Sequence, residues 1–303
     1  MSGSPARKDI TIPFGNASMA AWLYAAPSGS RKPGPAIVLG HGLGGVKEMR
    51  LDAFAEVFQK AGYTCVAFDY RGFGQSTGSE PQILDWNMQQ QDWDVVVEWV
   101  RSLPEVDPDQ IGIFGTSFGG AHAIAYAARD KRIKAAISQC PFTSGPHSTM
   151  TVGLSVAPKL ALLGIRDILF GKPNDFVPVK LCGEPGEVAL MNAPDVMPSL
   201  KKLVPDDMWD SYPRVVAARV ALQIPFLFPG AQAKNVSCPI YFAVCSRDSV
   251  APPGPTRSYA KQAPKGVVKD YDCGHFDIYV GSLFEQASKD YVEFLHKNLP
   301  VSL

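Results

Sequence analysis

The sequence predicts an α/β protein with a mostly parallel, doubly wound sheet and an inserted lid. Three observations favour this fold class. Short apolar runs typical of buried strands alternate with helical apolar stripes along most of the chain. Glycine-rich loops follow several of these runs. The alternation breaks between residues 143 and 236, which indicates an insertion into an otherwise regular α/β core.

The first third of the chain supplies the opening elements. Residues 9–13 and 19–24 are expected as an antiparallel pair, and residues 35–39 and 64–69 as buried parallel strands. A helix is expected after each of these two strands, because apolar residues recur there at helical spacing. The residues of these two stripes are Leu51, Phe54, Ala55 and Phe58, and then Trp93, Val96, Val97 and Val100.

Ser117 lies in the pentapeptide Gly115-Thr116-Ser117-Phe118-Gly119. A strand is expected at residues 110–114 and a helix rich in small residues at 121–128. A G-x-S-x-G sequence between a strand and a helix is the signature of a nucleophile elbow, a turn so sharp that the serine adopts a strained backbone conformation. The alternative is a glycine-rich turn that holds a serine by chance. We interpret Ser117 as a nucleophile.

The inserted segment begins after a strand expected at residues 133–138. We expect a helix at residues 154–170, a hairpin within 176–190 and further helix at 208–227. The predicted organisation is a core of residues 1–142 and 237–303 with a lid at 143–236. The lid is expected to lie over Ser117 and to bind a hydrophobic acyl or ring-bearing group. The alternative is a structural extension that only thickens the domain.

Asp248 is the candidate acid of a catalytic triad. It follows the apolar run at residues 239–244, which is typical of a strand buried on both faces. A carboxylate at that strand end can hold a histidine in the required tautomer. Asp272 is too close to the histidine along the chain, and Asp277 is kept as a minor rival.

His275 is the candidate general base. It lies between the last expected strand and the last expected helix, and it completes the chain order Ser, Asp, His. The other four histidines have structural interpretations. His122 is expected to pack on the elbow helix, His147 to lie in a loop and His296 to end the last helix. His41 belongs to a glycine-rich loop.

That loop, Gly40-His41-Gly42-Leu43-Gly44-Gly45, is the candidate source of an oxyanion donor. We expect the Leu43 amide and the Phe118 amide, directly after the nucleophile, to form the oxyanion hole. His41 is interpreted as a residue that orients the loop. The alternative is a glycine turn with no catalytic role.

Five motifs together resemble the α/β-hydrolase superfamily. They occupy residues 40–48, 68–74, 115–119, 247–252 and 274–279. Within that superfamily the chain resembles the dienelactone-hydrolase-like branch, which includes fungal polyketide transferases and bacterial esterase-like relatives. True dienelactone hydrolases use a cysteine nucleophile, whereas position 117 is serine here, so the resemblance does not imply dienelactone hydrolysis.

Composition favours one catalytic domain. Of 303 residues, 46% are hydrophobic and 19% charged, and the formal net charge is zero. A neutral chain is a poor nucleic-acid partner, and no run reaches the roughly 18 apolar residues of a transmembrane helix. The six cysteines show no C-x-x-C spacing, which favours free thiols, a cytoplasmic location and no zinc site.

The sequence therefore predicts a serine-dependent acyl hydrolase or acyltransferase that needs no cofactor. The expected substrate is a hydrophobic ester or thioester, free or presented by an acyl carrier. Carbon–carbon bond hydrolysis on the same triad and a non-catalytic binding protein are the alternatives. Epoxide and dehalogenation chemistry is disfavoured, because it needs an aspartate at the elbow.

Overall fold

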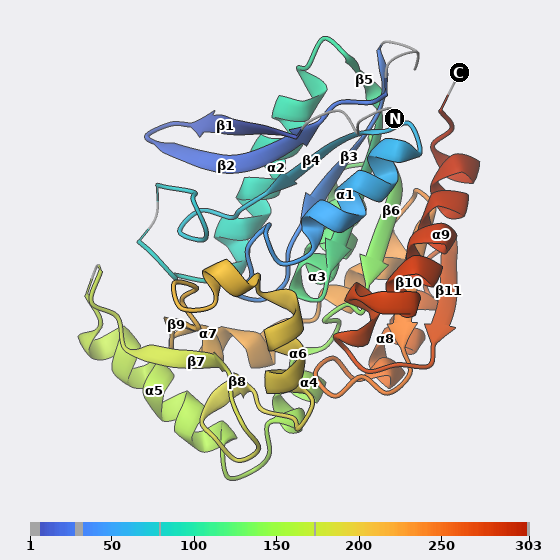
Figure 1. The fold of residues 1–303 in the computed structure, drawn as a ribbon. Helices are drawn as coiled ribbons and strands as arrows, with labels where there is room; N and C mark the ends of the chain where they lie inside the picture. Colours follow the sequence, from blue (N-terminus) through green and yellow to red (C-terminus); the bar gives the residue numbers. More distant parts are fainter. Residues whose placement is uncertain (1–6, 28–32, 79, 173, 302–303) are drawn as a thin grey trace.

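The computed structural model describes residues 7–27, 33–78, 80–172 and 174–301. Within these ranges, eight strands form one sheet in the order β1-β2-β4-β3-β5-β6-β10-β11 (Figure 1). β1 and β2 pair antiparallel, as expected, and β2 is antiparallel to β4, whereas the remaining neighbours are parallel. The strands span Lys8–Phe14 (β1), Ala17–Tyr24 (β2), Gly34–Gly40 (β3), Thr64–Phe68 (β4), Val106–Thr116 (β5), Ile133–Gln139 (β6), Ile240–Cys245 (β10) and Gly266–Tyr271 (β11).

Helices cover both faces of this sheet, as the alternation predicts. α1 (Leu51–Lys60) and α9 (Gly281–Asn298) pack against each other on one face. α2 (Trp86–Arg101), α3 (Phe118–Arg129) and α8 (Pro253–Ala260) cover the other. The expected stripes of α1 and α2 are buried, and the central parallel strands are buried along nearly their whole length.

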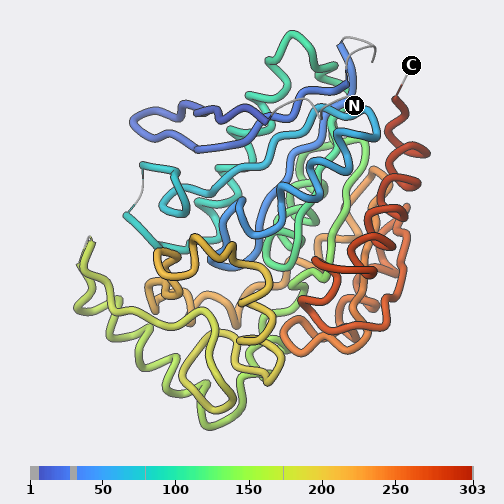
Figure 2. Tube along the Cα trace, in the orientation of Figure 1, coloured from blue at the N-terminus to red at the C-terminus, as the bar shows by residue number. Residues whose placement is uncertain are grey.

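The segment between β6 and β10 gathers at the carboxyl ends of the parallel strands, as the green-to-gold part of the trace in Figure 2 shows. It contains a small sheet in the order β8-β7-β9 and several short helices. The elements are α4 (Gly145–Thr151), α5 (Ala157–Phe170), β7 (Pro178–Cys182), β8 (Ala189–Met191), α6 (Val196–Leu203), β9 (Val215–Ala217), α7 (Val220–Gln223) and 3₁₀ helices at Asp206–Met208, Ile224–Phe226 and Pro229–Asn235. We call residues 143–236 the lid segment.

Two expectations for residues 176–227 are wrong. The helix at 154–170 is confirmed by α5, but the segment 176–190 is not a hairpin, because β7 and β8 are parallel. The antiparallel partner of β7 is β9, which lies within the stretch expected to be helical. Pro213 lacks the N–H that a continuous helix needs, and Ala217 donates its N–H to the Gln82 carbonyl. Helix is present only in the later part of that stretch, as α7 and the 3₁₀ helix at Ile224–Phe226. Long-range pairing therefore overrides the local apolar pattern.

Each of the six cysteines, all within the described ranges, is free and buried. Among the described residues, no helix is both long enough and apolar enough to cross a membrane.

Candidate active site

Ser117 lies on a sharp turn between β5 and α3. Its φ of 56° and ψ of −116° are strained for a residue with a side chain. The flanking glycines make the turn possible. A Cβ at Gly115 would lie 2.0 Å from the Gly119 carbonyl oxygen, and one at Gly119 would lie 2.4 Å from the His41 carbonyl oxygen. The pentapeptide thus has the geometry of an elbow that presents a serine hydroxyl at the carboxyl edge of the sheet.

The structure brings Ser117, His275 and Asp248 together in one hydrogen-bonded chain. The Ser117 Oγ lies 3.0 Å from His275 Nε2, and His275 Nδ1 lies 2.7 Å from Asp248 Oδ2. The other oxygen of Asp248 accepts hydrogen bonds from the amides of Val250 (2.9 Å) and Ala251 (2.7 Å). These amides fix the carboxylate, which in turn fixes the imidazole. The three residues follow β5, β10 and β11, whose carboxyl ends share one edge.

The alternative carboxylates lie elsewhere. Asp277 Oδ2 accepts a hydrogen bond from the Gly274 amide at 2.8 Å. Asp272 is largely exposed and forms an ion pair with Arg247. Asp277 therefore shapes the loop before His275 rather than contacting the imidazole nitrogen.

The other histidines have structural contacts. His122 is buried between Gln89 and Gln90, which hydrogen-bond its two ring nitrogens. His296 lies in the last turn of α9, as expected. The loop expected around His147 is wrong, because the residue lies in the first turn of α4, next to Ser144.

The environment of His275 favours its charged form. Burial on its own lowers the pKa of His275, but the carboxylate of Asp248 outweighs burial, and the pKa is raised to about 9. The neutral imidazole, which can accept a proton from Ser117, is therefore most populated in alkaline solution.

The glycine-rich loop after β3 lies against the elbow. A Cβ at Gly42 would lie 3.1 Å from the Ser117 Cβ, so only glycine fits there without a shift. The amides of Leu43 and Phe118 have no hydrogen-bond acceptor among the described residues. Two unoccupied backbone donors next to a serine hydroxyl are the arrangement that can stabilise an oxyanion.

A buried ion pair holds this loop in place. Lys47 Nζ lies 2.6 Å from Asp69 Oδ2, and the Lys47 amide donates to Asp69 Oδ1 at 2.7 Å. Both side chains are buried. His41, within the loop, donates from Nδ1 to the Gly42 carbonyl at 3.0 Å, and its Nε2 lies 4.0 Å from Asp69 Oδ1. Burial lowers the pKa of His41 to about 4, so its ring is neutral at ordinary pH.

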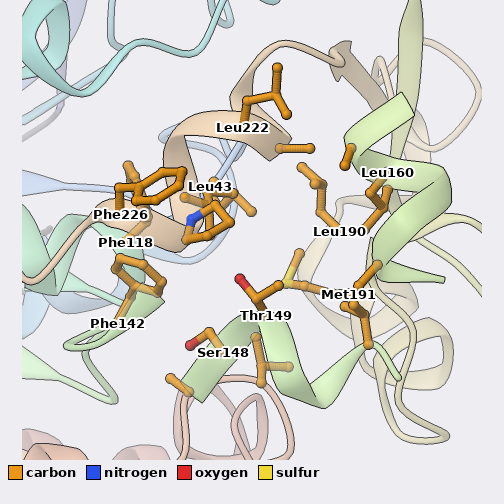
Figure 3. A pocket seen from close by; sticks show the side chains of 18 of the residues that line it. Leu43, Phe118, Phe142, Ser148, Thr149, Leu160, Leu190, Met191, Leu222 and Phe226 are labelled. Atoms are coloured by element: carbon orange, nitrogen blue, oxygen red, sulfur yellow. The ribbon is translucent and has the colours of Figure 1, made fainter. Parts of the chain in front are cut away.

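Ser117 lines a cavity of about 350 Å³. Figure 3 shows other side chains that line this cavity. The core contributes Leu43, Phe118 and Phe142 to its walls, and the lid segment contributes most of the rest. The walls are almost wholly apolar. The lid residues labelled in Figure 3 are Ser148, Thr149, Leu160, Leu190, Met191, Leu222 and Phe226. Its volume falls within the range of ~300–1,000 Å³ typical of small-molecule sites.

A second, smaller cavity of about 50 Å³ lies on the histidine side of Ser117. His275 and Phe276 line it, and neither lines the larger one. Ser117, Leu43 and Met191 border both cavities. The candidate nucleophile therefore lies where two apolar compartments of unequal size meet.

Two contacts between lid and core have no counterpart in the sequence-based interpretation. The Tyr212 hydroxyl donates to the Gly44 carbonyl at 2.7 Å, one residue from Leu43. The Ser249 hydroxyl donates to Asp195 at 2.7 Å, and Ser249 is the neighbour of Asp248. The sequence gives only a general indication of the Tyr212 contact, because a tyrosine hydroxyl that is buried usually has a hydrogen-bond partner.

The chain matches the model of the family described as alpha/beta hydrolase fold over residues 35–162. A relative described as quorum-quenching protein AidA, from Acinetobacter baumannii, is 42% identical over 97% of this chain and 95% of its own length. The polyketide transferase grgF from a Penicillium species is 32% identical over 60% of each chain. The solved structure of DcsB in complex with its substrate analogue superposes with a TM-score of 0.81 at 24% identity, covering 97% of this chain and 99% of the other.

Proposed function

This chain belongs to the α/β-hydrolase family, and from that premise we propose that it is a serine-dependent acyl hydrolase or acyltransferase acting on hydrophobic esters or thioesters. The observation that carries the proposal is the hydrogen-bonded chain from Ser117 through His275 to Asp248. The proposed roles are nucleophile, general base and orienting carboxylate.

In the first half-reaction, neutral His275 takes the Ser117 proton at Nε2 while Oγ attacks the acyl carbonyl carbon. The negative charge that develops on the carbonyl oxygen is stabilised by the amides of Leu43 and Phe118. Asp248 stabilises the imidazolium through Nδ1. Collapse of the tetrahedral intermediate breaks the bond to the leaving alcohol or thiol, which receives the proton from His275.

In the second half-reaction, water or an acceptor hydroxyl gives its proton to His275 and attacks the acyl-Ser117 carbonyl. Ser117 regains its proton when the acyl bond breaks. Water gives hydrolysis, and a substrate alcohol gives transfer. The relative named a polyketide transferase keeps transfer open for this chain.

The two cavities support a division of the substrate. The leaving group must lie within reach of the proton on His275, and that residue lines the small cavity. The acyl group then occupies the cavity of about 350 Å³ on the other side of Ser117. The proposed substrate therefore has a large apolar acyl part and a compact leaving group.

Labelling and acyl trapping test the proposal. A fluorescent fluorophosphonate is expected to label the wild type and Ser148→Ala, because the Ser148 hydroxyl lines the same cavity without a hydrogen-bond partner among the described residues. Ser117→Ala is expected to remain unlabelled and to lose well over 10²-fold in turnover. Mass spectrometry of a digest then identifies the acyl group on Ser117 after exposure to a panel of esters and thioesters. Labelling of Ser117→Ala, or more than about 1% residual turnover, would remove Ser117 as the nucleophile.

Two alternatives have distinct outcomes. A carbon–carbon hydrolase would be labelled on Ser117 but would leave every ester and thioester in the panel intact. A non-catalytic binding protein would stay unlabelled in the wild type.

A further inference from the structure

The lid segment carries an exposed apolar surface. Among the described residues, eleven large hydrophobic side chains are exposed, and nine of them belong to the lid segment. The set includes Leu162, Ile165, Ile168, Leu169 and Phe170 on α5 and Phe226 after α7. Single exposed apolar residues are ordinary on a protein surface, but a contiguous group on one element marks an interaction site.

The solvent-exposed face of α5 carries apolar side chains at helical spacing. Leu162, Ile165 and Leu169 recur at i, i+3 and i+7, so they form one stripe along the helix. The inner face is occupied, because Leu160, Gly164 and Asp167 are buried against the protein. α5 lies at the outer margin of the lid, away from the main sheet (Figure 1). We call Leu162, Ile165, Ile168, Leu169 and Phe170 the α5 face.

The exposed charges on α5 have one sign. Lys159 and Arg166 are exposed on α5, and neither forms an ion pair with another described residue. The acid within residues 145–170 is Asp167, which is buried and paired with Arg219 at 2.6 Å. Residues 220–229 carry no charge at all. The exposed charged side chains of α5 itself are therefore cationic, and the first exposed acid after the helix is Asp175, which forms an isolated β-bridge with Lys172.

The cations on α5 distinguish between two possible partners of the α5 face, a second copy of the chain and a surface of anionic amphiphiles. A second copy of the chain, related by a two-fold axis across α5, would bring Lys159 and Arg166 towards the same cations of its partner, with no exposed acid on either α5 to neutralise them. A surface of anionic amphiphiles supplies both missing features, apolar chains for the α5 face and negative headgroups for the cations.

We propose that the α5 face docks onto an anionic lipid surface. Docking on this side also has a use in the proposed reaction, and that part of the inference rests on the proposed function. Phe226 is exposed and lines the larger cavity, and Leu160 and Ala161 on the neighbouring face of α5 also line that cavity. Part of the wall of the candidate acyl site therefore adjoins the α5 face. A hydrophobic substrate dissolved in the lipid can then reach Ser117 without crossing bulk water.

Vesicle flotation with the full chain carrying Ser117→Ala tests docking independently of catalysis. We expect this protein to float with vesicles of equal parts phosphatidylglycerol and phosphatidylcholine and much less with phosphatidylcholine alone. Added salt is expected to weaken the binding. Absence of flotation with anionic vesicles would overturn the docking proposal, whereas the Ser117 labelling result would still decide the proposed function.

Matched variants locate the contact. Leu162→Gln with Leu169→Gln is expected to lower the partition coefficient more than tenfold, and Lys159→Ser with Arg166→Ser about fivefold for each cation removed. The controls are Val267→Gln, an exposed apolar residue on β11, and Lys134→Glu, an exposed cation at the start of β6. Neither control is expected to change flotation. Equal losses in the controls would overturn the assignment to the α5 face.

Light scattering completes the test. A monomer that floats supports the proposal. A dimer in solution that Leu162→Gln with Leu169→Gln converts to monomer would assign the α5 face to self-association instead. Failure to float, together with Arg166-dependent binding to an acyl-carrier protein, would assign it to an acidic protein partner. Either result would overturn lipid docking.

Discussion

At the scale of single residues, the candidate chemistry depends on how three side chains are held. Ser117 is held by a strained backbone, Asp248 by two amides and His275 by both of these residues. Each constraint comes from a different loop at one sheet edge. Change at one residue is therefore expected to act through the protonation or orientation of the next.

The raised pKa of His275 predicts a pH dependence. Below about pH 9 the imidazole is mainly protonated and cannot accept a proton, so kcat/KM is expected to rise with pH and level off above that value. In Asp248→Asn the carboxylate that raises the pKa is gone and burial, which lowers it, remains. The inflection is then expected at lower pH, with a plateau reduced on the order of 10⁴-fold, as in the best-studied triad.

Initial rates across the pH range measure both effects, and Asp277→Asn is the control. Asp277 bonds the Gly274 amide rather than the imidazole, so its variant is expected to keep the inflection of the wild type. A shifted inflection in Asp277→Asn and an unshifted one in Asp248→Asn would exchange their roles.

At the scale of elements, the lid segment contacts both the loop after β3 and the walls of the larger cavity. Tyr212 comes from the turn before β9, and its hydroxyl bonds the peptide next to Leu43. α5 and the short helices near residue 222 form the outer wall of the cavity. The lid segment is therefore expected to influence both the rate and the choice of acyl group.

Tyr212→Phe is expected to lower kcat about tenfold, because the loop that carries the Leu43 amide loses one restraint. This is less than the ~10²–10³ lost when an oxyanion donor itself is removed. Tyr63→Phe is the matched control, since its buried hydroxyl donates to the Leu299 carbonyl at 2.8 Å, far along the chain from the loop. Both variants are expected to lose about 1 kcal/mol of unfolding free energy. Equal kcat values for the two would show that Tyr212 has only a structural role.

Ala161→Phe is expected to shorten the preferred acyl chain, because Ala161 lines the larger cavity. For p-nitrophenyl esters from acetyl to decanoyl, kept below their aggregation limit, kcat/KM for long chains should fall roughly fourfold per displaced methylene. Acetyl turnover should stay unchanged. Leu162→Phe, on the outward side of the same helix, is the control and should keep the wild-type profile. A uniform loss along the series would place the acyl chain elsewhere.

At the scale of the whole molecule, the sequence predicts the core far better than the lid. Ser117 and Asp248 follow buried strand ends and His275 follows the edge strand β11. Parallel strands bring such positions to one edge of the sheet whatever the length of chain between them. No comparable rule predicts how the elements of the lid segment are arranged. The apolar residues of β9 have a spacing that also suits a helix, and only pairing with β7 makes this segment a strand. That pairing joins residues 178 and 217, which are far apart in the sequence. The contact of Tyr212 with Gly44 likewise depends on how the lid segment packs against the core.

The Lys47–Asp69 ion pair affects the stability of the whole molecule, because it joins the loop after β3 to the loop after β4 inside the protein. Lys47→Met would leave Asp69 buried without its counter-ion. Loss of one partner of such a pair costs about 3–5 kcal/mol, and the Tm should fall by roughly 2 °C for each kcal/mol in a domain of this size. Lys60→Met is the control, since Lys60 pairs with Glu56 at 3.6 Å with both side chains exposed, and its loss should cost less than about 1 kcal/mol. Calorimetry of the two variants measures the difference. Similar Tm values would mean that Asp69 is held by the amides of Lys47 and Gln75 alone, and the loop would then owe its position to backbone contacts rather than to the buried charge.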